Sequence, residues 1–134
     1  MMRHRIAATL ALSLLATPLG AQASDISTHV LDLAQGIGGA DIPATLERKD
    51  AAGNWTRVAT ARTDGNGRIR SFGEGIDTPP GIYRISFDMT AYAGSVAKPF
   101  FPEISVTFRA DEAKAHYHVP VVVSPYGYSS YRGN

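Results

Sequence analysis

Apolar and polar residues alternate along much of the chain downstream of residue 23. In the segment 42–49, for example, Ile42, Ala44 and Leu46 share one face of an extended chain, and mostly polar or charged residues share the other. A period of two with one apolar face is typical of a half-buried β-strand. Strands are predicted on this basis for residues 26–33, 42–49, 55–62, 81–89, 104–109 and 116–124.

Short turn sequences separate these segments. The glycine-rich stretches 35–41 and 63–68 and the turn at 50–54 carry residues that favour tight reversals. Only residues 88–96 could form a helix, and they are too few for much more than two turns. The chain is therefore expected to be all-β, a β-sandwich or barrel of seven to eight strands with one short helix. Pro120 has no N–H to give to a ladder, which predicts an edge position or a bulge in its strand.

Residues 1–23 have the pattern of a secretory signal peptide. A short basic head, RHR at 3–5, precedes an apolar run at 6–20 and an Ala-Gln-Ala cleavage pattern at 21–23. The apolar run is too short and wrongly flanked for a membrane-spanning helix. The mature chain is therefore expected to be one domain, residues 24–134, exported to the periplasm of a bacterium.

Charge and cysteine content narrow the possible partners. The whole chain has 13 Lys and Arg against 12 Asp and Glu, and loss of Arg3 and Arg5 with the signal peptide changes the formal net charge from +1 to −1. A nearly neutral domain without a basic stripe gives no reason to expect nucleic acid or, after cleavage, a membrane as partner. Since the chain has no cysteine, its fold must rely on the hydrophobic core and on subunit association rather than on disulfides.

The mature chain has three histidines, His29, His116 and His118. His116 and His118 are two residues apart in a predicted strand and therefore point to the same face. A strand histidine is most often half-buried and satisfied by one hydrogen bond. One alternative is a three-histidine zinc site, although no Asp or Glu near the pair is an obvious supporting partner. The other is metal-free acid–base chemistry near neutral pH.

Acid–base chemistry of that kind needs a cation to hold a developing negative charge, and Arg68 is the candidate. It follows the glycine turn 65–67, which can bring a side chain into a cleft, although an arginine beside a hairpin turn is more often a solvated charge. The chain has no G-x-S-x-G elbow, no phosphate-binding glycine loop and no cysteine nucleophile. Tyr126, Tyr128 and Tyr131, near the C-terminus, are of the type enriched at subunit interfaces.

Four segments carry a family resemblance: STHVLD at 27–32, NGR at 66–68, FFPEISVTF at 100–108 and HYHVPVVVSPYGYSSYRG at 116–133. Over nearly the whole mature chain the sequence resembles the 5-hydroxyisourate hydrolases, the transthyretin-related proteins of purine breakdown. The resemblance implies a transthyretin-like (prealbumin-like) β-sandwich that assembles as a homotetramer, a dimer of dimers, with active sites in clefts where the dimers meet. It also implies hydrolysis of 5-hydroxyisourate to 2-oxo-4-hydroxy-4-carboxy-5-ureidoimidazoline in urate degradation, without a metal or organic cofactor.

Matched by motif, the catalytic residues that the resemblance implies are His29, Arg68 and His118. A histidine with a pKa near neutral can take a proton from the attacking water, and this role is left open between His29 and His118. Arg68 would stabilise the negative charge that grows on the substrate ring. His116 is either an orienting residue for His118 or a structural one.

The resemblance also assigns substrate-binding residues at the C-terminus. Tyr131, Arg132 and Gly133 are expected to shape the floor of the cleft, and Asn134 stands where the family has a terminal serine. Asn66 replaces the aspartate of the family's D-G-R turn. A non-catalytic carrier or small-molecule binding module on the same sandwich is the alternative function. The resemblance implies that such carriers lack the histidine and arginine set, so its retention here favours an enzyme.

Overall fold

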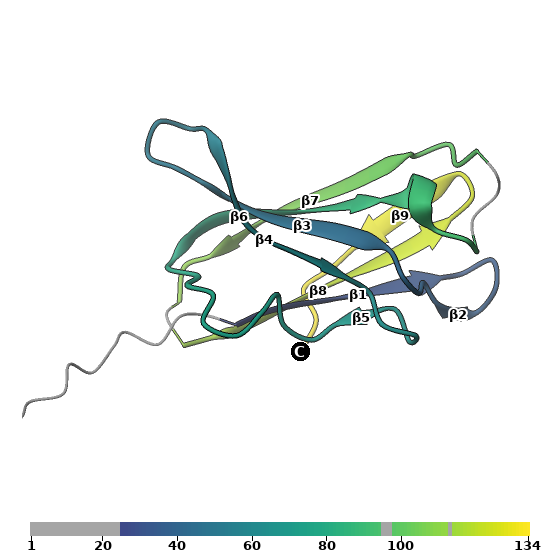
Figure 1. The fold of residues 1–134 in the computed structure, drawn as a ribbon, viewed down its shortest axis with the longest axis horizontal. Coiled ribbons are helices and arrows are strands. Elements are labelled where there is room, and N and C mark those ends of the chain that lie inside the picture. Colours follow the sequence, from purple (N-terminus) through teal and green to yellow (C-terminus); the bar gives the residue numbers. More distant parts are fainter. Residues whose placement is uncertain (1–24, 95–97, 113) are drawn as a thin grey trace, which may run out of the picture.

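Residues 25–94, 98–112 and 114–134 are described by a computed structural model, in which two β-sheets pack face to face (Figure 1). One sheet has the strand order β2-β1-β8-β9, with β5 paired to β1, and the other has the order β4-β3-β6-β7. In chain order the elements of these residues are β1 (Asp25–Asp32), β2 (Ile37–Gly38), β3 (Pro43–Lys49), β4 (Trp55–Arg62), β5 (Arg68–Ile69), β6 (Gly81–Asp88), the 3-10 turn η1 (Met89–Ala91), β7 (Glu103–Ala110), β8 (His116–Ser124) and β9 (Gly127–Ser130).

The all-β sandwich expected from the sequence is therefore confirmed. The six predicted strands correspond to β1, β3, β4, β6, β7 and β8, and each boundary differs from its prediction by one residue at most. The strands that were not predicted, β2, β5 and β9, are only two to four residues long, and a period of two cannot be recognised over such short segments. The predicted signal peptide, residues 1–23, lies outside the described residues.

The helix predicted at 88–96 is present as the single turn η1, and residues 95 and 96 lie outside the described part of the chain. Asp88 caps this turn, because its Oδ1 accepts a hydrogen bond from the N–H of Thr90 at 3.0 Å. Across residues 25–94, 98–112 and 114–134, no helix has the length and apolar character needed to cross a membrane.

The alternation seen in the sequence places the core between the sheets. The predicted apolar face of β3 is buried, and the side chains of Tyr83, Ile85 and Phe87 on β6 are 0–1% exposed. Full burial of one such side chain stabilises the fold by about 1.5–3 kcal/mol. The sheet that contains β1 and β8 has a polar outer face, which carries the histidines of these two strands.

The strands β1 and β8 pair in parallel although they lie near opposite ends of the chain. Asp25 is paired with His116, Ser27 with His118 and His29 with Pro120. The hydroxyl of Thr28, buried on the core side, donates to the carbonyl oxygen of Val119 at 2.6 Å. This pairing brings the outward-facing polar residues of the two strands together.

Pro120 corrects one expectation, because β8 is not an edge strand but lies between β1 and β9. The β8–β9 ladder ends at the pair Val121 and Ser130 and resumes as a single bridge between His118 and Gly133. Pro120 lies in the interval, where its missing N–H leaves the ladder without a donor. The hydroxyl of Ser130 donates to the carbonyl oxygen of Pro120 at 2.8 Å.

A buried polar group fixes the loop that follows β1. The carboxylate of Asp32 accepts hydrogen bonds from the Tyr92 hydroxyl at 2.8 Å and from the Gln35 side chain at 2.9 Å. Burial raises the pKa of Asp32, but these bonds and those from the Ala34 and Gln35 amides outweigh burial and leave it lowered. Burial, and then the bond to Asp32, raises the pKa of Tyr92 to about 12.

Candidate active site

A tight turn places Arg68 at the start of β5. The carboxylate of Asp64 accepts hydrogen bonds from the N–H groups of Asn66 and Arg68, both at 2.9 Å, and these bonds lower its pKa. Gly67 has φ of +80°, and a Cβ there would lie 2.3 Å from the carbonyl oxygen of Val30. Only glycine allows this approach, which pairs Arg68 with His29 across β5 and β1.

His29 is fixed by the same turn. Its Nε2 lies 2.8 Å from the carbonyl oxygen of Asn66, and because a carbonyl only accepts, Nε2 carries the proton. His29 lines an open cleft of about 550 Å³ together with Leu31, Ile37 and Arg68. The polar imidazole therefore stands beside an arginine on one side and apolar side chains on the other.

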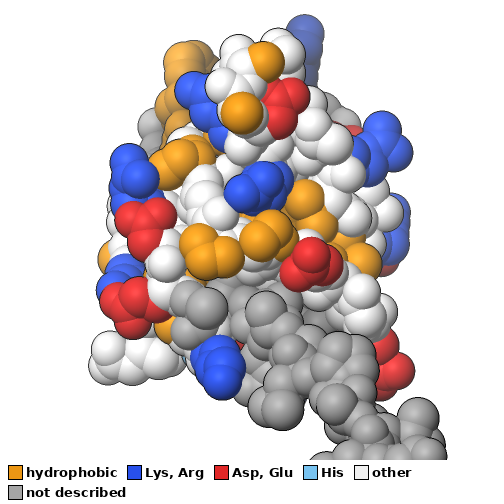
Figure 2. Space-filling view, turned by 90° about the vertical axis from the view of Figure 1, so that its left-hand side faces the viewer, with side chains coloured by type: hydrophobic (Ala, Val, Ile, Leu, Met, Phe, Trp, Pro, Cys, Tyr) orange, Lys and Arg blue, Asp and Glu red, His pale blue; other side chains and the backbone are white. Residues whose placement is uncertain are grey.

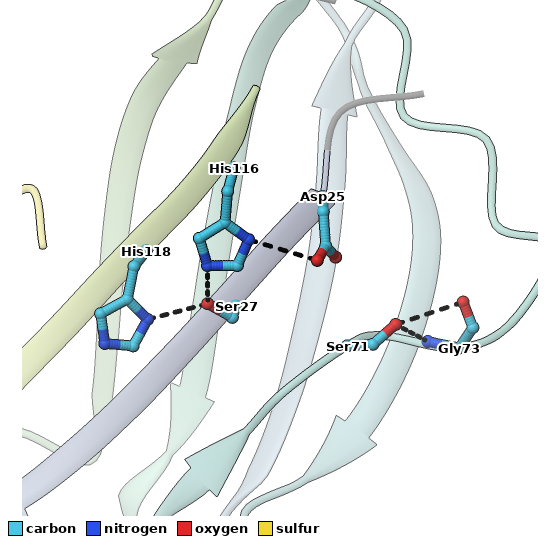
Figure 3. Close-up of polar contacts among 6 residues, drawn as sticks. All are labelled: Asp25, Ser27, Ser71, Gly73, His116 and His118. Atoms are coloured by element: carbon cyan, nitrogen blue, oxygen red, sulfur yellow. Dashed lines mark hydrogen bonds and ion pairs between the residues drawn. The ribbon is translucent and has the colours of Figure 1, made fainter. Parts of the chain in front are cut away.

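His118 and His116 share a hydroxyl (Figure 3). The Oγ of Ser27 lies 2.8 Å from Nδ1 of His118 and 3.0 Å from Nε2 of His116. The other ring nitrogen of His116, Nδ1, lies 3.2 Å from a carboxylate oxygen of Asp25. The two imidazole rings are nearly parallel, with centroids 6.4 Å apart, as expected for residues on one face of β8.

A second open cleft, of about 490 Å³, contains most of the ionisable residues of the site. It is lined by Arg68, Arg70, His116, His118 and Asn134, with Ser27, Thr28 and Ile69. Burial lowers the pKa of His118, and the positive charge of Arg68 and the neighbouring histidines lower it further. His118 is thus held in its neutral, basic form at lower pH than an ordinary histidine. Arg68 lines this cleft and that of His29, so it joins the two histidines.

The C-terminal residues lie in two places, the cleft beside His118 and a neighbouring groove. Asn134 lines the cleft beside His118, and Gly133 is bridged to His118 through its backbone N–H at 2.8 Å. The guanidinium of Arg132, by contrast, lies over the ring of Tyr117, 5.2 Å from its centroid. Arg132 and Tyr131 line a neighbouring groove between β7 and β8, so within one chain they do not join Asn134 in the cleft.

The positions of the three histidines can be compared with what a three-histidine zinc site would require. No group of three His, Asp or Glu side chains suited to holding a metal ion is found within residues 25–94, 98–112 and 114–134. The expectation that the histidine pair lacks an acidic partner was wrong, because Asp25 contacts His116. Asp25 is 91 residues away in sequence and reaches His116 only through the parallel pairing of β1 and β8.

Three residues of the site were missed in the sequence: Asp25, Ser27 and Arg70. Ser27 is two positions before His29 and therefore on the same face of β1, which was a usable signal. Arg70 is likewise two positions after Arg68. Asp25 lies one residue before the predicted strand, which began at residue 26, whereas β1 begins at Asp25 itself. Its relation to His116 depends on strand pairing, which alternation along one segment does not reveal.

The end of the sandwich that carries the β3–β4 turn has a mixed surface of charged and hydrophobic side chains (Figure 2). In Figure 2, which shows this end, basic and acidic side chains are interspersed around scattered hydrophobic ones. Among the described residues on this face, no large patch of a single charge sign is seen in Figure 2.

Comparisons with known proteins identify relatives of the chain. The family model described as "HIUase/Transthyretin family" matches residues 26–133. The 5-hydroxyisourate hydrolase of Salmonella dublin is 39% identical over 137 residues, covering 99% of this chain and all of its own. Sea bream transthyretin in complex with thyroxine has a TM-score of 0.73 and 31% identity, covering 81% of this chain and 94% of that one. Klebsiella pneumoniae 5-hydroxyisourate hydrolase has a TM-score of 0.69 and 29% identity, covering 83% of this chain and 99% of that one.

Proposed function

The chain belongs to the HIUase/transthyretin family, and on that premise we propose that it hydrolyses 5-hydroxyisourate to 2-oxo-4-hydroxy-4-carboxy-5-ureidoimidazoline in urate degradation. The observation that carries the proposal is the position of Arg68, which lines one cleft with His29 and another with His118. A cation between two imidazoles, in clefts open to a small ligand, provides the charge and the proton acceptor that hydrolysis of a cyclic amide requires.

The chemistry proposed here uses protein side chains alone. A neutral imidazole, of His29 or His118, accepts a proton from water as the water oxygen bonds to a ring carbonyl carbon. Negative charge then develops on the carbonyl oxygen, and the guanidinium of Arg68 stabilises it. When the carbon–nitrogen bond breaks, the ring nitrogen takes a proton from an imidazolium. Asn134, at the wall of the cleft, can both donate to and accept from the substrate.

A non-catalytic carrier is the second candidate. The fold does not separate the two, because a thyroxine-bound transthyretin and a hydrolase are similar to this chain at comparable TM-scores. The site favours the enzyme, since a half-buried imidazole with a lowered pKa beside an arginine is an arrangement typical of acid–base catalysis.

The direct test is a decay assay. Urate and urate oxidase generate 5-hydroxyisourate in situ, and its ultraviolet absorbance is followed with and without the mature chain. We expect decay several orders of magnitude faster than the spontaneous rate. A rate equal to the spontaneous one, from a folded protein, would reject the enzyme and leave the carrier. Metal analysis of the same preparation, with and without chelator, tests the zinc alternative.

Assembly and location are further parts of the proposal. We propose a homotetramer, a dimer of dimers, because large apolar side chains are exposed on the single chain and its clefts are open to solvent. Those side chains include Leu33, Ile37, Phe100, Tyr126 and Tyr128. Light scattering of the mature chain measures the assembly. Export to the periplasm, after cleavage at residue 23, is tested by fractionation of cells that express the full chain with and without residues 1–23.

A further inference from the structure

Four side chains on the outer face of the β1–β8 pair form one continuous line of hydrogen bonds. From Asp25 the line passes to His116, from His116 to the Oγ of Ser27, and from Ser27 to His118, with distances of 3.2, 3.0 and 2.8 Å. Figure 3 shows that the second nitrogen of His118 points away from Ser27. The line thus begins at a carboxylate and ends at Nε2 of His118, a residue that lines the cleft, and among the described residues no hydrogen-bond partner is found for that nitrogen.

The donors and acceptors of this line give it a direction. An ionised carboxylate only accepts, so Asp25 requires the proton of neutral His116 to be on Nδ1. The Nε2 of His116 then accepts, and the one hydroxyl proton of Ser27 must be directed at it. Ser27 can therefore only accept from His118, which places the proton of neutral His118 on Nδ1 and leaves Nε2 as a lone pair.

The charges at the two ends of this line differ. His118 shares one cleft with Arg68 and Arg70, and it borders a second groove with Arg109 and Arg132. The charge of Arg68 opposes a positive charge on His118. At the other end of the line, Nδ1 of His116 lies 3.2 Å from a carboxylate oxygen of Asp25.

We propose that Asp25, Ser27 and His116 form a proton relay that sets His118 as the general base and then removes the proton it collects. This inference rests on the proposed function and deepens it, because it decides between His29 and His118. His29 is on no such line: its Nε2–H is bonded to the carbonyl oxygen of Asn66, which has no proton to exchange. Asp25, Ser27 and His116 act through His118 and are positioning residues.

The relay conserves every proton over one turnover. The Nε2 of His118 takes a proton from the attacking water and becomes an imidazolium. Its Nδ1 proton passes to the Oγ of Ser27, whose own proton passes to Nε2 of His116. His118 is then neutral again with the proton on Nε2, and His116 is the imidazolium beside Asp25. When the carbon–nitrogen bond of the substrate breaks, His118 gives the Nε2 proton to the leaving nitrogen, and the two transfers through Ser27 reverse.

The tautomers of the histidines test the relay without any substrate. Long-range ¹⁵N–¹H spectra of the mature chain labelled at histidine, at a pH near 8, report which ring nitrogen carries the proton. We expect Nδ1–H for His116 and His118 and Nε2–H for His29. In Ser27→Ala, His118 should change toward the Nε2–H form. An Nε2–H tautomer of His118 in the unmodified chain, or no change in Ser27→Ala, would overturn the relay.

Steady-state kinetics in the decay assay test whether catalysis uses the relay. Ser27→Ala should lower kcat about 10- to 100-fold with little change in KM, by analogy with the loss of a hydrogen-bond partner that orients a metal-bound histidine. Ser27→Thr keeps the hydroxyl and should restore most of the rate. Asp25→Asn should lower kcat about 10-fold, because His116 loses the carboxylate that holds its Nδ1–H. Ser105→Ala and Asp111→Asn, at exposed positions away from the cleft, are the matched controls.

The outcomes separate the relay from the proposed function. If the unmodified chain does not accelerate decay, the proposed function fails, and the spectra still report whether the hydrogen-bond line exists. If the unmodified chain is active and Ser27→Ala and Asp25→Asn are equally active, the proposed function stands and the relay is wrong. Loss of rate in both variants, with restoration in Ser27→Thr, supports the relay.

Discussion

Gly133 lies directly against the imidazole ring of His118. Its N–H donates to the carbonyl oxygen of His118 at 2.8 Å, and a Cβ built at position 133 would lie 2.5 Å from Cδ2 of the ring. Such a contact cannot exist without displacement, because real Cβ atoms do not approach other heavy atoms so closely. The next-to-last residue of the chain thus sets the position of a proposed catalytic side chain.

Gly133→Ala should therefore lower kcat/KM. The added methyl group must push the His118 ring or the chain terminus away, and a displacement near 1 Å costs about 100-fold in rate. The decay assay measures the rate, and thermal unfolding should be nearly unchanged because residue 133 lies outside the named strands. Gly127→Ala is the matched control: its Cβ would meet only the Oγ of Ser124, at an ordinary 3.5 Å. An alanine at 133 that leaves the rate intact would contradict this role.

Arg68→Ala should lower kcat by about 100- to 1,000-fold, the usual effect of removing a group that stabilises a developing oxyanion. Arg68→Lys keeps the charge but loses the planar fork of donors, so it should recover only part of the rate. Arg57→Ala, on the exposed side of β4, controls for loss of a surface charge. Retention of full activity in Arg68→Ala, with the fold verified by circular dichroism, would exclude Arg68 from the chemistry.

The acid side of the pH–rate profile should fall at a pH below 6.5, the ordinary pKa of histidine. Burial, and then the charge of Arg68, lower the pKa of His118, so its basic form persists to lower pH. Arg68→Gln removes the second cause and should move the midpoint of this limb upward, although the remaining rate will be small. Stability depends on pH in the same direction. Neutral His118 contributes folding stability that is present above pH 6.5 and is lost as the pH falls through the lowered pKa of His118. An acid limb at or above pH 6.5 would assign the limb to another group.

Much of the fold was predictable from the sequence, because the six longer strands each carry several cycles of alternation. Their pairing was not, since alternation along a segment does not say which segment lies beside it. Ser27 and His118 are 91 residues apart, and they meet only because β1 and β8 pair in parallel. The edge position or bulge expected at Pro120 is not found. The register of β8 against the C-terminal segment is the same on both sides of Pro120, and the missing N–H is accommodated by a local gap in the ladder.

The candidate site was predictable in part. Arg68 and the three histidines were identified by residue type and by the family resemblance, and the structure gathers them on one face of the sheet. The role of Arg132 stays a prediction. Within one chain its guanidinium lies over the ring of Tyr117, and Arg132 lines a neighbouring groove rather than the cleft of Arg68 and Asn134.

Tyr92→Phe should destabilise the fold by about 1.5 kcal/mol, because the buried carboxylate of Asp32 loses one of its hydrogen bonds. Urea unfolding at neutral pH measures this difference, and Tyr126→Phe, at a side chain that is 82% exposed, is the control. The pKa of Tyr92 is raised to about 12, so the stability that its protonated form provides is present below pH 10 and is lost as pH rises through 12. The unmodified chain should therefore lose more stability than Tyr92→Phe across that range. Equal losses would show that the hydroxyl is not buried against Asp32.

Asn134 tests whether an amide can serve at the last position of the cleft. It lines the cleft together with Arg68 and His118, and like a serine hydroxyl it can both donate and accept a hydrogen bond. Since one hydrogen bond contributes about 1 kcal/mol, Asn134→Ser should change kcat/KM by about fivefold or less. Asn134→Leu keeps the size of the side chain and removes both its hydrogen-bond donor and its acceptor. This variant should lower kcat/KM by about fivefold or more.

Both variants are measured in the decay assay against the unmodified chain, with KM and kcat determined separately. A gain much above tenfold in Asn134→Ser would mean that the bulkier amide obstructs the substrate in the cleft. Full activity in Asn134→Leu would mean that the terminal side chain makes no hydrogen bond to the substrate. In that case the contribution of the C-terminus is carried by Gly133, through the position it gives to His118.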